Sequence, residues 1–165
     1  LELKGMTIIF DLDATVIDSS HRQLANLDGS LDLANWRENC TQEKIMRDSL
    51  LPLADGMRDF ISRGWHVIIC TARIMGEFDY QFLKENGLYV GDILSRPNDC
   101  NMADADLKEM LLRGYAASIG FSYARFCKSA SIYDDNKKVL ERLASHGILA
   151  HDSISLNETL KLKKA

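Results

Sequence analysis

Two carboxylates one residue apart, Asp11 and Asp13, follow directly after the apolar run Thr7-Ile8-Ile9-Phe10. Neighbouring like charges raise each other's pKa unless a positive group lies beside them. The pair therefore either projects into water as part of a turn, the commoner situation for an isolated D-x-D, or it holds a cation. The rest of the sequence decides between these readings.

Two further apolar runs end on polar groups of the same kind. The run "HVIIC" is followed by Thr71 and Arg73, and "ASIY" is followed by Asp134 and Asp135. Each of these groups alone is compatible with a turn or a helix cap. Parallel strands, however, end at one edge of their sheet, where ligands of α/β proteins bind. Four carboxylates, a hydroxyl and an arginine at one edge indicate a Mg²⁺ and phosphate site.

The elements that must position these groups are short apolar runs that alternate with amphipathic stretches along the whole chain. This order predicts an α/β fold with a central parallel sheet covered by helices on both faces. Gly64, Gly87 and Gly147 each follow an amphipathic stretch and are expected to end helices. We expect a single domain over residues 1–165.

One interval is too long for a simple connection. About forty residues separate Thr15 from the helix expected near Ala54, and they are rich in polar and aromatic residues. We expect an insertion, or small cap, with its own short helices at approximately residues 17–52. Its place at the carboxyl end of the first strand is typical of lids and specificity loops.

Composition narrows the class of protein. The 165 residues are 46% hydrophobic and 27% charged, which is typical of a globular domain, and the net charge of −4 does not favour a protein that coats duplex DNA. The four cysteines lack metal-site spacing, which favours structural thiols in a reduced, cytoplasmic protein. No run approaches the roughly 18 apolar residues that span a bilayer, so we expect no membrane association, and no protein partner is evident.

The chain resembles the haloacid dehalogenase (HAD) superfamily of phosphatases. Its first motif, D-x-D-x-T/V, matches Asp11 to Thr15, with Ala14 in place of the usual Gly; the strand-ending Thr or Ser matches Thr71. The motif Lys is best matched by Lys108, and the acidic pair by Asp134 and Asp135. The resemblance implies a Rossmann-like three-layer α/β/α sandwich with a small helical insertion after the first strand.

The resemblance also implies a chemistry and a role for each motif residue. Asp11 would be the nucleophile that forms an aspartyl-phosphate, and Asp13 the general acid and then the general base. Mg²⁺ would be held by Asp11, by the backbone carbonyl of Asp13 and by Asp135, with Asp134 supporting the metal shell. The phosphate would be bound by two further motif residues, Thr71 and Lys108.

The residues around these motifs resemble the 3′-phosphatase domain of bacteriophage-type polynucleotide kinases. The matching positions are Arg22, Arg73, Arg96 and, four residues before Lys108, Asp104, and the resemblance implies that they contact substrate. Deoxyribonucleotidases and other small HAD phosphatases share part of this pattern. No G-x-x-x-x-G-K-S/T motif is present, so we expect a stand-alone phosphatase without a kinase half.

We therefore expect a Mg²⁺-dependent phosphomonoesterase with a phosphorylated nucleotide or oligonucleotide substrate, in particular a 3′-phosphate end. The alternatives are a 5′(3′)-deoxyribonucleotidase, another small-molecule HAD phosphatase, or a nucleotide-binding HAD protein without turnover. Trp36 and Tyr80 could stack on a base, although core packing is the better interpretation of both. His21 is expected to face solvent or to support the site indirectly.

Overall fold

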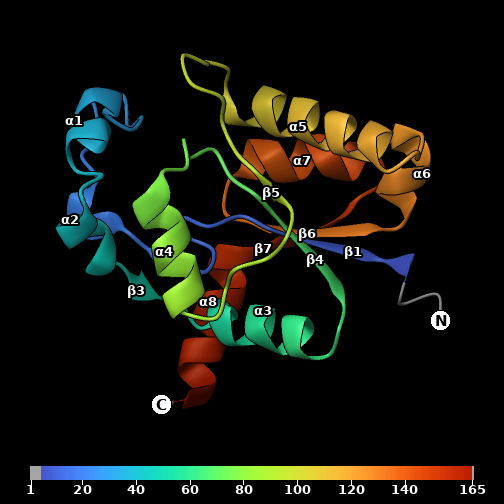
Figure 1. The fold of residues 1–165 in the computed structure, drawn as a ribbon, viewed down its shortest axis with the longest axis horizontal. Coiled ribbons are helices and arrows are strands. Elements are labelled where there is room, and N and C mark those ends of the chain that lie inside the picture. The colour runs from blue at the N-terminus through green and yellow to red at the C-terminus, as the bar shows by residue number, and fades with distance from the viewer. Residues whose placement is uncertain (1–4, 165) are drawn as a thin grey trace.

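The computed structural model describes residues 5–164, and a five-stranded parallel sheet forms its centre (Figure 1). The strand order is β5-β4-β1-β6-β7. The strands are β1 (Thr7–Phe10), β4 (His66–Cys70), β5 (Ile93–Leu94), β6 (Ala130–Asp134) and β7 (Leu149–Asp152). All four residues of β1 are buried, as expected for a central strand covered on both faces and rich in β-branched side chains.

The register of the central strands places their polar ends together. Phe10 of β1 pairs with Ile69 of β4 on one side and with Tyr133 of β6 on the other. The residues that follow these positions are Asp11, then Cys70 with Thr71, and Asp134 with Asp135. The polar groups predicted to meet at one sheet edge therefore do so.

Six helices form the layers on the two faces of the sheet (Figure 1). On one face, Ile8, Phe10 and Ile69 belong to a core that is completed by helices α3 (Leu53–Ser62), α4 (Glu77–Glu85) and α8 (Ser153–Lys164). On the other face, Ile9 and Ile68 pack with α5 (Asp104–Ser118), α6 (Tyr123–Lys128) and α7 (Lys137–Ser145). The expected three-layer α/β/α sandwich is confirmed.

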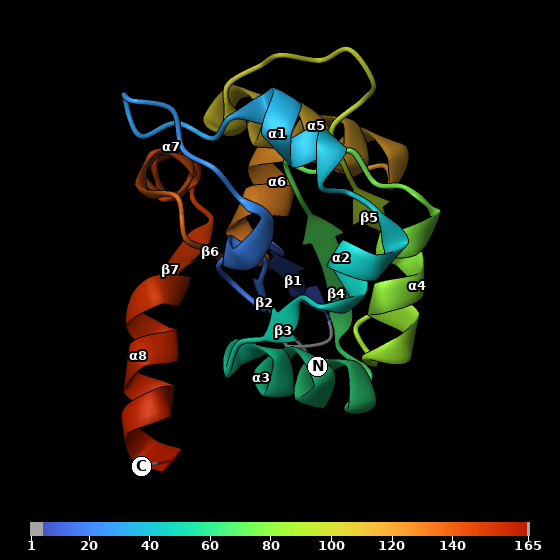
Figure 2. The same ribbon diagram turned by 90° about the vertical axis from the view of Figure 1, so that its left-hand side faces the viewer.

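The segment after β1 carries short elements of its own. Strands β2 (Ile17–Asp18) and β3 (Ser49–Leu50) pair antiparallel, and helices α1 (Leu33–Glu38) and α2 (Gln42–Met46) lie between them in the sequence. Figure 2 shows α1 and α2 in front of the carboxyl ends of the sheet strands. The segment thus has the short helices expected of the insertion; its function as a cap remains a prediction.

Helix ends follow the expected glycines. Gly64, Gly87 and Gly147 come just after α3, α4 and α7, and all three have positive φ. At Gly87 a Cβ would also lie 3.3 Å from the Arg58 side chain, so both backbone and space favour glycine there.

Helices α5 and α6 are separated by a turn at Gly120, whose φ is +77°. Strand β5 is only two residues long. Helix α8 was not foreseen from its weakly patterned sequence, although it covers one face of the sheet.

All four cysteines are free thiols, two of them buried. Among the described helices, none combines the length and apolarity that crossing a bilayer requires.

Candidate active site

Asp11 lies at the end of β1 with its side chain almost completely buried. Lys108, on the second turn of α5, donates to Oδ1 of Asp11 at 2.8 Å, and the Thr15 hydroxyl donates to Oδ2 at 3.0 Å. Both oxygens are therefore oriented by a neighbour. A buried carboxylate fixed in this way is suited to act as a nucleophile along one direction.

The carboxylates of Asp11, Asp134 and Asp135 form a group, here called the acidic cluster, in which one oxygen of each residue lies within 4.8 Å of the others. Lys108 donates to Asp134 at 2.6 Å as well as to Asp11, so this one ammonium faces three carboxylates. Burial and the Asp11 carboxylate raise the pKa of Asp134 to about 6 and that of Asp135 to about 8. The acidic cluster therefore carries more negative charge than Lys108 neutralises.

This donor set fits a hard divalent cation. Three carboxylates at this spacing offer oxygen ligands only, which is the preference of Mg²⁺. The raised pKa values have the same origin as metal affinity, since a cation would relieve the repulsion that burial intensifies. The predicted ligands Asp11, Asp134 and Asp135 are thus brought together by the fold.

Asp13 has a different environment, although it is only two residues away. Arg73 binds its carboxylate with two donors, Nε to Oδ2 at 2.8 Å and Nη2 to Oδ1 at 2.7 Å, and the Ser19 hydroxyl donates to Oδ1 at 2.5 Å. Burial opposes ionisation of Asp13, but the charge and hydrogen bonds of Arg73 outweigh it and lower the pKa. A quarter of the Asp13 side chain remains exposed, in contrast to its partner Arg73 at 3%.

Arg73 is part of a larger group of paired charges, here called the arginine network: Asp13, Arg22, Asp48, Arg73 and Asp79. Nη1 of Arg73 donates to Asp79 at 2.7 Å, and Nη2 also reaches Asp48 at 3.3 Å. Asp48 receives two bonds from Arg22, at 2.9 and 2.8 Å. Two arginines and three carboxylates thus satisfy one another in a buried region.

The indole of Trp36, on α1, packs against this network. The guanidinium carbon of Arg22 lies 4.2 Å from the ring centroid of Trp36, and that of Arg73 lies 5.6 Å from it. Trp36 is therefore a packing partner of both arginines, as a cation–π contact, and connects the inserted segment to the site.

The remaining predicted site residues are Thr71, Arg96 and Asp104. Thr71 is fully buried, and its hydroxyl accepts from the backbone N–H of Arg73 at 3.1 Å, which leaves the hydroxyl proton available to another acceptor. Arg96 binds the carbonyls of Ala72 and Met102 at 2.9 and 2.8 Å and Asp104 at 3.1 Å. Arg96 and Asp104 thus brace the loops after β4 and β5; their expected contact with substrate remains a prediction.

Two residues that were not predicted from the sequence, Asp48 and Asp79, help to hold the site together. Asp48 lies in a polar segment without pattern, and nothing in the sequence signals its partners 26 and 25 positions away. Asp79 offered one signal, because it caps α4 by accepting from the Gly76 N–H at 2.8 Å. Nε2 of His21 lies 2.8 Å from Oδ1 of Asp48, which accepts its hydrogen bond, so His21 supports the site indirectly, one of its two expected roles.

Helix α8 clamps the loop that follows the nucleophile. Ser153 shares a hydrogen bond of 3.0 Å with the Thr15 hydroxyl, and the Asn157 amide donates to the Thr15 carbonyl at 2.9 Å. Asn157 also accepts from the N–H of Leu53 at the start of α3. The loop is held in a turn in which Ala14 has φ 61°, a conformation that favours the glycine usual in the HAD motif.

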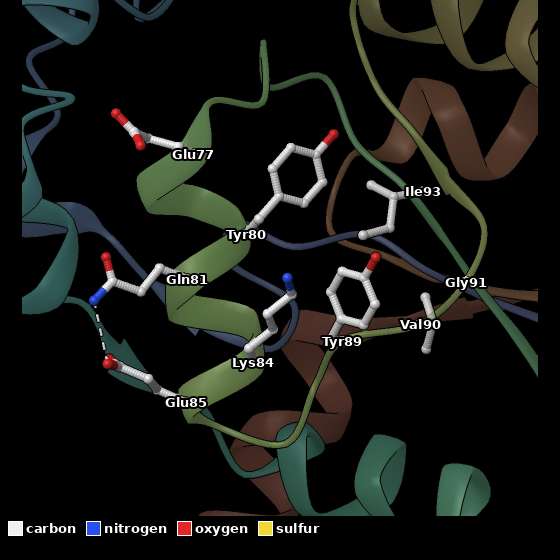
Figure 3. A pocket seen from close by; sticks show the side chains of 9 residues that line it. All are labelled: Glu77, Tyr80, Gln81, Lys84, Glu85, Tyr89, Val90, Gly91 and Ile93. Atoms are coloured by element: carbon white, nitrogen blue, oxygen red, sulfur yellow. Dashed lines mark hydrogen bonds between the residues drawn. The ribbon is translucent and has the colours of Figure 1, made fainter.

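A surface hollow of about 740 Å³ lies elsewhere, between α4 and the chain leading into β5 (Figure 3). Tyr80 and Tyr89 line it from the two sides, with the Lys84 ammonium 4.9 Å from the centroid of the Tyr89 ring. None of the predicted catalytic or phosphate-binding residues lines this hollow. Tyr80 therefore belongs to the outer side of α4 and not to the acidic cluster.

Sequence comparison gives two agreeing results. The family described as "Bacteriophage T5 5′-deoxynucleotidase" matches residues 3–165. The 5′-deoxynucleotidase of Escherichia phage T5 is 34% identical over 170 residues, which cover 94% of this chain and 70% of the phage protein.

Comparison with solved structures supports the fold. A haloacid dehalogenase-like hydrolase of Streptococcus pneumoniae superposes with a TM-score of 0.60 at 14% identity, over 93% of this chain and 91% of the other. A chain of the Pnkp1/Rnl/Hen1 RNA repair complex gives a TM-score of 0.62 at 18% identity, over 89% of this chain and 42% of the other. The arrangement of sheet and helices is therefore that of the HAD fold.

Proposed function

The chain belongs to the bacteriophage T5 5′-deoxynucleotidase family and is a phosphatase with the HAD fold, and from this premise we propose that it is a Mg²⁺-dependent nucleotide phosphomonoesterase that works through an aspartyl-phosphate. The observation that carries the proposal is the acidic cluster beside Lys108, with one oxygen of each carboxylate within 4.8 Å of the others at the sheet edge. A nucleophile, a phosphate-binding cation and ligands for a divalent metal meet there.

In the first step a carboxylate oxygen of Asp11 attacks phosphorus and forms the acyl phosphate, while the bond from phosphorus to the ester oxygen breaks. The leaving oxygen takes a proton from Asp13. In the second step Asp13 accepts a proton from water, whose oxygen attacks phosphorus; inorganic phosphate leaves and the Asp11 carboxylate is regenerated. The ion pair with Arg73 favours the ionised form of Asp13 that this second step requires.

The phosphate would be oriented by Thr71 and Lys108. The hydroxyl of Thr71 has a free proton to donate, because its oxygen already accepts from Arg73 N–H. Lys108 already holds Oδ1 of Asp11 at 2.8 Å, so an anion at the nucleophile would meet its charge. Asp11, Asp134 and Asp135, with the backbone carbonyl of Asp13, would hold Mg²⁺, which supplies charge that reduces repulsion between the nucleophile and the phosphate.

The phage T5 relative is named for action on 5′-deoxynucleotides, which supports a deoxynucleoside monophosphate as substrate. The motif positions Arg22, Arg73, Arg96 and Asp104 support the second candidate, a polynucleotide 3′-phosphate end. In the structure the donors of Arg22 and Arg96 contact protein acceptors, so a long oligonucleotide would have to be held by other groups as well.

A substrate panel tests the proposal. Deoxynucleoside 5′- and 3′-monophosphates, a 3′-phosphorylated oligonucleotide and p-nitrophenyl phosphate are compared by phosphate release with and without Mg²⁺. We expect turnover that needs Mg²⁺ and a higher kcat/KM for one nucleotide class than for the aryl ester. Equal kcat/KM for all four esters would contradict the nucleotide assignment, and activity unchanged by a chelator would contradict the metal assignment.

The covalent step has its own test. Rapid quenching with labelled substrate should trap a phosphoenzyme that hydroxylamine releases, as expected of an acyl phosphate. The Asp11→Asn variant should give no label. Label of equal amount in Asp11→Asn would exclude Asp11 as the nucleophile.

A further inference from the structure

Asp48 lies near the end of the inserted segment, directly before its last strand, β3. Its side chain is completely buried, which for a carboxylate requires compensation by partners. It accepts from Nε and Nη2 of Arg22 at 2.9 and 2.8 Å, and it contacts His21 at 2.8 Å and Nη2 of Arg73 at 3.3 Å. One carboxylate thus joins both buried arginines of the site.

The contact with Arg73 is the one that reaches the chemistry. Nη2 of Arg73 is shared between Asp48 at 3.3 Å and Oδ1 of Asp13 at 2.7 Å. Nη1 is held from the other side by Asp79 at 2.7 Å. The plane of the guanidinium is therefore fixed by two carboxylates that do not react, and its remaining edge is presented to Asp13.

The charge of Arg22 gives a second argument that Asp48 positions Asp13. With Asp48 in place, Arg22 has a carboxylate of its own, and the two side chains are 1% and 0% exposed. Without that charge, Arg22 would be a buried cation against the face of Trp36, 4.2 Å away, in the same network of charges as Arg73 and Asp13. The Asp13 carboxylate would then be attracted by two arginines and drawn away from the leaving oxygen.

We propose that Asp48 is a positioning residue for the acid–base step: by neutralising Arg22 and fixing Arg73, it keeps the Asp13 carboxylate where it can serve the leaving group. The inference rests on the proposed function, since it presumes a phosphoryl transfer in which Asp13 delivers the proton. The contacts of Asp48 are to Arg22, Arg73 and His21, so it would act through Arg73 and Asp13. Through the hydrogen bonds of Asp48 to Arg22 and Arg73, the inserted segment would contribute to catalysis.

The test uses leaving groups of different quality, because only a poor one needs its proton in the transition state. The Asp48→Asn variant keeps the shape of the side chain and loses the charge. We expect its kcat/KM for a deoxynucleoside 5′-monophosphate, an alkoxide leaving group, to fall by about 10- to 100-fold, a part of what general acid catalysis supplies. Its kcat/KM for p-nitrophenyl phosphate should change by less than about 3-fold, since nitrophenolate leaves unprotonated.

Two comparison variants show whether the loss in Asp48→Asn comes from the acid–base step. Asp13→Asn should show the same selectivity to a larger degree, and Asp59→Asn, an exposed aspartate paired with Arg63, should change neither value. An equal loss on both esters in Asp48→Asn, or no loss, would overturn the inference. Wild-type protein inactive on both esters would overturn the proposed function itself.

Asp48→Asn leaves Arg22 as a buried unpaired charge and risks failure to fold. The double variant Arg22→Met with Asp48→Asn removes both charges and is measured in the same way. We expect it to melt as a folded protein and to keep a selective loss on the nucleotide, because Arg73 is still released on one side. Wild-type activity on both esters in the double variant would show that Asp48 acts only by neutralising Arg22, and would overturn its proposed role in fixing Arg73.

Discussion

The acidic cluster and the arginine network are built from the same kinds of residue at one edge of the sheet, but they differ in the number of cations and in the direction of the pKa shifts. In the acidic cluster one lysine faces three carboxylates, and the pKa values of Asp134 and Asp135 are raised. In the arginine network two arginines meet three carboxylates through multiple short bonds, and the pKa of Asp13 is lowered.

This difference separates two uses of buried charge. The proposed Mg²⁺ would add the positive charge that the acidic cluster lacks. A group in which every carboxylate accepts from an arginine, as in the arginine network, holds its members in fixed orientations. Asp11 belongs to the acidic cluster and Asp13 to the arginine network, so the short turn between them joins the two groups.

The largest effect should follow from removing the nucleophile in the acidic cluster. Asp11→Asn should lower kcat by about 10⁴-fold or more, in the range known for lost nucleophiles. The variant should not melt below wild type, since it removes one of three repelling carboxylates. Phosphate release and thermal unfolding measure the two quantities; a substantial residual kcat would place the nucleophile elsewhere.

Breaking the arginine network should instead act on stability. Arg73→Met leaves three carboxylates, those of Asp13, Asp48 and Asp79, without their shared partner, and should lower the free energy of unfolding by about 3–5 kcal/mol. Urea denaturation measures the change. Arg63→Met, which removes an exposed pair with Asp59, is the matched control and should change stability by no more than about 1 kcal/mol. If the two variants were equally stable, the network would not have the structural role assigned to it.

Metal binding should stabilise the acidic cluster and leave the arginine network unaffected. At about 100 times its dissociation constant, Mg²⁺ should add about 2.7 kcal/mol, or about 5–11 °C in Tm for a chain of this size. Removal with a chelator should abolish this gain together with activity. Asp135→Asn should respond less to Mg²⁺, whereas Asp79→Asn should respond as wild type does.

The pH dependence of the metal-free protein should carry the signature of the acidic cluster. The pKa values of Asp134 and Asp135 in the folded state are about 6 and about 8, against an ordinary value of 3.8. Between pH 3.8 and about pH 8, the folded protein therefore binds more protons than the unfolded chain. Its stability should therefore fall as the pH rises from about 4 to about 8. Scanning calorimetry without metal measures this trend, which saturating Mg²⁺ should weaken; a metal-free Tm that rises over this window would contradict it.

The smallest effect concerns the turn that joins the two groups. Ala14 has φ 61°, and Ala14→Gly should remove a backbone strain of roughly 1 kcal/mol, partly offset by the greater freedom of glycine in the unfolded chain. We expect a net gain of about 0.5 kcal/mol in urea denaturation. Ala117→Gly, at an exposed position inside α5, should lose about 1 kcal/mol and serves as the control.

The acidic cluster was predictable from the sequence, whereas most of the arginine network was not. Asp11, Asp134 and Asp135 each follow a β-branched apolar run, and the geometry of parallel strands then brings them together. Asp48 follows no such run. Its partners are fixed by the path of the inserted segment, which depends on packing around Trp36 that no periodicity reveals.

Helix α8 is a second part of the site that was not predictable from the sequence. Ser153 and Asn157 are buried polar residues that hold Thr15, yet a serine and an asparagine in a lysine-rich segment are usual on a surface. The hydrophobic pattern of the helix is weak because it covers the sheet with few large side chains. Apolar periodicity makes a helix or strand recognisable in the sequence, whereas a structural role that depends on single hydrogen bonds leaves no such pattern.

The clamp by α8 also has a consequence for biosynthesis. The bonds from Ser153 and Asn157 to Thr15 span 138 and 142 residues of chain, so the loop beside the nucleophile gains its last supports only after residue 157 has been made. At about 5–20 residues per second, a ribosome needs roughly 7–28 s to add those residues. During that interval the nascent chain carries the strand with Asp11 but not the contacts that fix its loop. The loop beside the nucleophile is thus complete only when translation has supplied the last helix of the chain.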